Sequence, residues 1–117
     1  MNVTVYGIPT CGTVKKARAW LDARGVSYRY VDLRQAPPDR ATVEAWARAF
    51  GTKPMRNTSG GSYRALGDRK ESWDDADWIE AFAADAMLLK RPVVLIGDRP
   101  ALVGFDEAAY AAALTGR

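Results

Sequence analysis

The sequence predicts an α/β domain built on one mixed β-sheet that is flanked by helices. A strand–helix–strand pattern opens the chain, and a continuous apolar run, "VVLI", lies late in it. A turn, a returning strand and a final helix follow this run. The length of 117 residues fits one compact domain with a core of its own.

The first elements form a β-α-β unit. Val3 and Val5 alternate with polar residues, which predicts a short opening strand. Residues 13–24 contain no helix breaker, and Gly25 follows where a helix C-cap is expected. Residues 26–33 predict a second strand. The crossover through a single helix requires the two strands to be parallel.

The middle of the chain is predicted to be helical. Asp39 is suited to cap a helix that ends at Gly51 and carries the apolar residues Val43, Trp46, Ala47 and Phe50. Residues 52–70 are expected to be a loop, because "NTSGGS" lies at their centre. Asp74 and Asp75 then begin another helix, with its inner face formed by Trp78, Ile79 and Phe82.

The end of the chain predicts two strands and a helix. The apolar run 93–96 is typical of a buried strand. A turn at residues 97–100 leads into a returning strand at 101–103. Gly104 precedes the final helix, for which Asp106 is a suitable N-cap.

The cysteine and histidine counts limit the chemistry. The chain has one cysteine and no histidine. An internal disulfide, a multi-cysteine zinc site and a Cys-His or Ser-His pair are therefore excluded, and we expect no metal site. A reactive cysteine in this chain must be activated by a helix terminus or by Lys and Arg.

The charge and hydropathy patterns indicate a cytoplasmic protein. The net charge is +3, and basic residues are scattered among acidic ones, so direct nucleic-acid binding is not expected. Apolar runs are all shorter than the ~20 residues that a membrane span requires. The N-terminus also lacks the pattern of a signal peptide.

Cys11 lies between the first strand and the first helix. It is either a small buried hydrophobic residue or a nucleophile at a helix start. The second alternative is favoured because the positive end of the helix dipole stabilises a thiolate. Gly12 permits a tight loop, Thr10 and Thr13 offer hydroxyl groups, and Lys15 adds positive charge.

Several stretches give the chain a family resemblance. These are "YGIPTCGTVKKARAWLDARGVSYRYVDLR", "NTSGGSYRAL" and "LLKRPVVLIGDRPALVGFDEAAYAAAL". Together they resemble the ArsC/Spx/YffB family over essentially the whole chain, with most likeness to the YffB branch. The resemblance implies a thioredoxin-like, glutaredoxin-like fold. Residues 1–33 and 88–117 would form its βαβ and ββα parts, with a helical insertion at about 38–87.

The resemblance also implies a site around Cys11. Pro92 would be a cis proline facing the cysteine, and Arg91 would contact its thiolate or a bound oxyanion. Gly104, Phe105 and Asp106 would receive a carboxylate of glutathione, although Asp106 is equally suited to cap the helix. Arg56 lies near a further arginine position of the family.

The implied function is glutathione-dependent thiol reduction by a monomer, through a mixed disulfide at Cys11. Two alternatives remain. One is arsenate reduction coupled to glutaredoxin. The resemblance argues against it, because Gly104 occupies the position at which arsenate reductases carry an arginine. The other is an Spx-like regulator that binds RNA polymerase, although Val14 replaces the second cysteine of the Spx motif.

Overall fold

The computed structural model describes residues 2–114, which form two compact units. The first unit comprises the chain up to Leu33 and again from Arg91 onward. The second unit comprises Arg34–Lys90.

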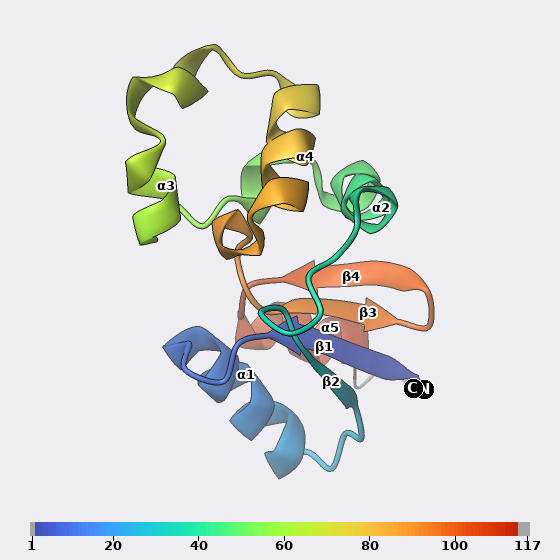
Figure 1. Ribbon diagram of the computed structural model, residues 1–117. Helices are drawn as coiled ribbons and strands as arrows, with labels where there is room; N and C mark the ends of the chain where they lie inside the picture. Colours follow the sequence, from blue (N-terminus) through green and yellow to red (C-terminus); the bar gives the residue numbers. More distant parts are fainter. Residues whose placement is uncertain (1, 115–117) are drawn as a thin grey trace. The chain divides into compact units, whose positions relative to one another are not determined.

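The first unit contains a four-stranded mixed sheet in the order β2-β1-β3-β4 (Figure 1). Its strands are β1 (Val3–Gly7), β2 (Arg29–Asp32), β3 (Val93–Ile96) and β4 (Arg99–Val103). β1 runs parallel to β2 and antiparallel to β3, and β3 forms an antiparallel hairpin with β4. The predicted mixed sheet and its parallel crossover are confirmed, although β2 is shorter than the predicted strand at 26–33.

Two helices pack against one face of this sheet, α1 (Gly12–Ala23) and α5 (Glu107–Leu114). The shared core consists of Val3, Val5, Val94, Ala17, Leu21, Tyr110 and Leu114. The three valines come from β1 and β3, and the other four residues come from the helices. Both helices are therefore fixed to the central strands by apolar burial.

The two ends of α1 are well defined. Its N-cap is Cys11, so the helix begins one residue before the predicted start. At its C-terminus, Gly25 has a φ of 70°, and the Val26 N–H donates to the Leu21 carbonyl at 3.0 Å. This is a Schellman motif, for which glycine is the favoured residue.

Gly7 allows α1 to start close to the end of β1. A Cβ atom at Gly7 would lie 2.8 Å from Cγ2 of Val14, which is fully buried in the first turn of α1. Because real Cβ atoms do not approach so closely, only glycine fits without a shift of Val14. This close approach brings the N-terminus of α1, and with it Cys11, to the end of the strand.

The second unit is helical. It contains α2 (Arg40–Phe50), α3 (Gly61–Ala65) and α4 (Asp75–Ala84), with short 3₁₀ segments η1 (Lys53–Met55), η2 (Gly67–Ser72) and η3 (Ala86–Leu88). The predicted caps are confirmed, because the Asp39 carboxylate accepts from the Thr42 N–H at 2.8 Å and Asp74 forms a capping box. Trp46, Trp78 and Phe82 are buried, whereas Ile79 is only partly so.

The predicted loop at 52–70 was wrong, since η1, α3 and part of η2 lie within it. These segments are too short to show a helical period in the sequence. They are held by packing instead: Met55 is fully buried, and the Tyr63 ring stacks on Trp78 with centroids 6.1 Å apart. Among residues 2–114, no helix combines the length and the hydropathy needed to cross a membrane.

Candidate functional site

The Cys11 backbone is fixed from both sides. Its N–H donates to the Ile8 carbonyl at 3.2 Å, which closes the turn after β1. Its own carbonyl accepts from the Lys15 N–H at 3.0 Å, the first hydrogen bond of α1. With φ −79° and ψ 124°, Cys11 has the extended backbone of an N-cap residue. The thiol is therefore held where the unpaired N–H groups of the helix begin.

The pKa of the Cys11 thiol is lowered by its surroundings. Partial burial opposes this by raising the pKa, because a thiolate loses solvation. Hydrogen bonds from the backbone N–H groups of Val14 and Thr13 and from the Arg91 side chain lower it, and so does the charge of Arg91. The hydrogen bonds and the guanidinium charge outweigh burial, so the thiolate is favoured at a lower pH than for an ordinary cysteine.

The arginine that acts on the Cys11 thiol, Arg91, lies far from Cys11 in the sequence and is followed by Pro92. Arg91 is the first residue of the first unit after its return and directly precedes β3. The Arg91–Pro92 peptide bond is cis, as the family resemblance implied. Arg91 is half-buried, and its side chain lies within hydrogen-bond distance of the Cys11 sulfur.

Gly104 is hydrogen-bonded to Pro92, the neighbour of Arg91. Its N–H donates to the Pro92 carbonyl at 2.8 Å, and its φ is 79°, a conformation that glycine adopts readily. The N–H of Gly104 is thus already used within the protein. Binding of a carboxylate by the loop of Gly104, Phe105 and Asp106 stays a prediction.

Most of the other predicted residues lie near the start of α1 or α5. Thr10, Gly12, Thr13 and Lys15 are exposed around the N-terminus of α1. The backbone N–H of Thr13 is one of the groups that lower the pKa of the Cys11 thiol. The Phe105 ring packs edge-on against the Tyr110 ring, with centroids 4.9 Å apart. Asp106 is exposed, and its backbone carbonyl accepts from the Tyr110 N–H at 3.0 Å, the first hydrogen bond of α5. Asp106 therefore stands at the N-cap position, which was the alternative role considered for it.

Arg56 belongs to the second unit, where it has partners of its own. Its Nη2 donates to the Thr52 hydroxyl at 3.1 Å, and its guanidinium lies 4.2 Å from the centroid of the Trp78 ring. Thr52 in turn donates to Asp75 at 2.7 Å. These contacts stabilise the second unit, and the role of Arg56 in ligand binding stays a prediction.

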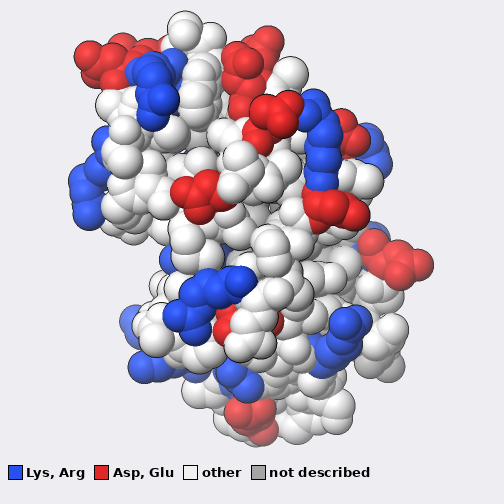
Figure 2. All heavy atoms as spheres, viewed as in Figure 1, with Lys and Arg blue, Asp and Glu red and all other residues white. Residues whose placement is uncertain are grey.

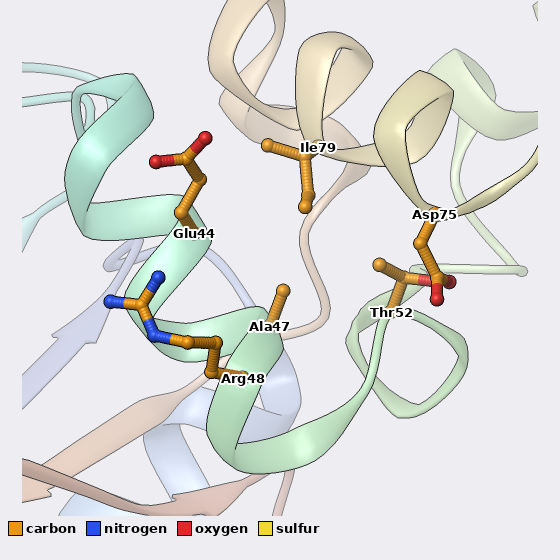
Figure 3. Close-up of a pocket in the computed structure, with 6 residues that line it drawn as sticks. All are labelled: Glu44, Ala47, Arg48, Thr52, Asp75 and Ile79. Atoms are coloured by element: carbon orange, nitrogen blue, oxygen red, sulfur yellow. The ribbon is translucent and has the colours of Figure 1, made fainter.

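The second unit also has a cavity between α2 and α4 (Figure 3). Its volume is about 340 Å³, and its lining residues are Glu44, Ala47, Arg48, Thr52, Asp75 and Ile79. None of these residues is a predicted site residue. On the face drawn in Figure 2, basic and acidic side chains are interspersed, in line with the scattered charges of the sequence.

Tyr110 also belongs to this region, although it was not predicted from the sequence. Its hydroxyl donates to the Gly104 carbonyl at 2.6 Å, and only 1% of the residue is exposed. The one sequence feature that could have pointed to Tyr110 is its hydroxyl group within the alanine-rich stretch "EAAYAAAL". A buried tyrosine needs a hydrogen-bond partner, but the identity of that partner depends on the turn at Gly104.

Known proteins resemble this chain over most of its length. The ArsC family model matches residues 6–113. The uncharacterized protein YusI of Bacillus subtilis (strain 168) is 33% identical over 111 residues, which cover 92% of this chain and 93% of YusI. An arsenate reductase of Rhizobium meliloti (strain 1021) is 30% identical over 97 residues, 81% of this chain and 69% of the reductase.

The solved structure of a protein named YFFB superposes with a TM-score of 0.88 at 39% identity, covering 96% of this chain and 98% of that one. This likeness extends over both units. It confirms the thioredoxin-like fold that the resemblance implied.

Proposed function

The chain belongs to the ArsC family, and we propose that it is a glutathione-dependent thiol reductase with Cys11 as its nucleophile. One observation carries the proposal: Cys11 is the N-cap residue of α1, and the helix N–H groups together with Arg91 lower the pKa of its thiol despite burial. Such an environment is typical of a reactive cysteine rather than of a structural one.

The reaction runs through two thiol–disulfide exchanges. The Cys11 thiolate attacks a sulfur of a glutathionyl mixed disulfide, R–S–SG. An S–S bond forms between Cys11 and the glutathionyl sulfur, the S–S bond of the substrate breaks, and R–S⁻ leaves with the bonding electron pair. A glutathione thiolate then attacks Cys11–S–SG, which releases oxidised glutathione and restores the Cys11 thiolate. The substrate is reduced by two electrons, and two glutathione units are joined as the disulfide.

The single cysteine supports an external resolving thiol. The chain holds no second thiol that could displace the substrate from Cys11. Glutathione supplies such a thiol together with carboxylates, for which Arg91, Lys15 and the loop at Phe105–Asp106 are the proposed recognition groups. Because the cycle consumes reduced glutathione, we assign the protein to the cytoplasm.

Glutathionylated peptide is the direct test substrate. Turnover is followed as formation of oxidised glutathione, with reduced glutathione in excess, and intact mass detects the Cys11 adduct of +305 Da, roughly the mass of one glutathionyl group. The Cys11→Ser variant keeps the size of the side chain and removes the nucleophile. We expect turnover and an adduct with the parent protein and neither with the variant. A parent protein that forms no adduct and does not turn over would exclude the proposal.

Arsenate reduction is the second candidate, because an arsenate reductase is among the relatives and Arg91 contacts the thiol. It uses the same Cys11 as nucleophile toward arsenate, with glutathione and glutaredoxin as reductants. Arsenate-dependent NADPH oxidation in a coupled assay separates the two. We expect the glutathionylated peptide to be the better substrate, because Gly104 supplies no cation to the oxyanion.

A further inference from the structure

Two consecutive hydrogen bonds join Tyr110 to Pro92, the residue that follows Arg91. The Tyr110 hydroxyl donates to the Gly104 carbonyl at 2.6 Å, and the Gly104 N–H donates to the Pro92 carbonyl at 2.8 Å. Arg91 is bonded directly to Pro92, and its side chain contacts the Cys11 sulfur. The two bonds therefore end one residue from the guanidinium that favours the thiolate.

The Tyr110 ring also contacts the helix that carries Cys11. It packs edge-on against Trp20 of α1, with centroids 5.8 Å apart and planes at 81°. On its other side, Phe105 packs edge-on at 4.9 Å. Tyr110 thus touches α1 by its ring and the β4–α5 turn by its hydroxyl, so it links that turn to the helix that carries Cys11 at its N-cap.

The hydroxyl of Tyr110 is a permanent donor. Burial raises its pKa well above the usual value, because a phenolate would lose its solvation. It therefore stays protonated over the pH range in which Cys11 titrates. A donor of this kind holds the Gly104 carbonyl at every working pH.

We propose that Tyr110 is a positioning residue for the Cys11 site, whose hydroxyl acts through Gly104 and Pro92 to hold Arg91 against the thiol. The proposal deepens the proposed function and rests on Cys11 being its nucleophile. Tyr110 touches no reacting atom. Its effect on the reaction is the placement of the guanidinium.

The first test is the Tyr110→Phe variant, which keeps the ring and removes the hydroxyl. The rate of Cys11 alkylation by iodoacetamide is measured from pH 5 to 10, so that the profile gives the thiol pKa. We expect the pKa to rise by half a unit or more, equivalent to roughly a threefold loss of thiolate below the pKa. An unchanged profile would overturn the proposal, whatever the variant does to stability.

A second variant separates positioning from general loosening of the core. Leu114→Val removes one methylene from the same helix and the same core cluster but leaves the hydroxyl bond intact. We expect it to lower the midpoint of urea unfolding without moving the Cys11 pKa. If Leu114→Val shifts that pKa as far as Tyr110→Phe does, the hydroxyl has no special role and the proposal fails.

The route through Arg91 is tested in a double-mutant cycle. Arg91→Met removes the guanidinium whose placement is in question. We expect Tyr110→Phe to have no further effect on the Cys11 pKa in that background. An equal shift with and without Arg91 would contradict the proposed route.

These outcomes are independent of the disulfide chemistry. Alkylation reads the thiolate directly and needs no glutathione. If glutathionylated peptide is not turned over while the Tyr110 effect is present, the proposed function fails and the positioning role stands. If turnover is normal and the Tyr110 effect is absent, only the positioning role fails.

Discussion

The Arg91 guanidinium contacts the Cys11 sulfur and favours its thiolate by both hydrogen bonding and charge. The two residues come from the two separate segments of the first unit, Cys11 from the start of α1 and Arg91 from just before β3. The nucleophile and its activating cation are thus assembled by the sheet, since β1 and β3 are neighbouring strands.

Replacing Arg91 with Met should raise the Cys11 pKa, because burial remains while the hydrogen bond and the positive charge are lost. Iodoacetamide alkylation at pH 6 should slow several-fold, on the order of tenfold for each unit of pKa. Arg99→Met is the matched control, since it removes the same charge from an exposed position in β4. Equal slowing in both variants would mean that net charge, and not the contact, sets the pKa.

The stability of the protein should depend on pH through Cys11. Because the folded pKa is lowered, the unfolded state binds the proton more readily. The free energy of unfolding should therefore rise with pH from the folded pKa up to the unfolded value of about 8.5, and this contribution is lost as the pH falls through the folded pKa. Urea unfolding of the parent and Cys11→Ser across this range isolates the thiol. A difference that is constant with pH contradicts the lowered pKa.

Gly7→Ala should destabilise the protein by about 1–3 kcal/mol, because the new methyl group overlaps the buried Val14 side chain. The shift of α1 should also slow Cys11 alkylation. Gly12→Ala is the control on the other side of Cys11, where an added Cβ meets no atom within 4 Å. It should leave the urea midpoint nearly unchanged. Similar losses in both variants would show that the close approach to Val14 is unimportant.

Arg56→Met should lower the stability by about 1 kcal/mol, through loss of the stacking on Trp78 and of the hydrogen bond to Thr52. The Cys11 pKa should not change. Urea unfolding and the KM for glutathione are measured on the same variant. Unchanged stability together with a raised KM would assign Arg56 to ligand binding instead.

The sequence predicts the first unit well because each of its elements has a local cause. The strands have apolar runs, α1 has Gly25 behind it, and the cis bond before Pro92 follows from the family resemblance. The helices α2 and α4 were equally clear from Asp39, Gly51 and Asp74.

Other features depend on tertiary contacts that no local pattern contains. The turns of residues 53–72 are held by Met55 and Tyr63 against their surroundings rather than by periodicity. The donors to Cys11 are partly backbone N–H groups, which every residue type carries. The hydrogen bond of Gly104 could not be foreseen either, because its N–H donates to the carbonyl of Pro92, which is distant in the sequence.

Because the thiol at the N-cap of α1 is the only one in the sequence, its ionisation can be followed without a label. With no other cysteine and no histidine, a proton lost from sulfur near neutral pH comes from Cys11 alone. Its titration is a single microscopic event, free of the shared protons that blur assignments in two-cysteine sites. Each variant of Arg91, Tyr110 or Gly7 can therefore be read as a change at one sulfur atom, in the unlabelled protein.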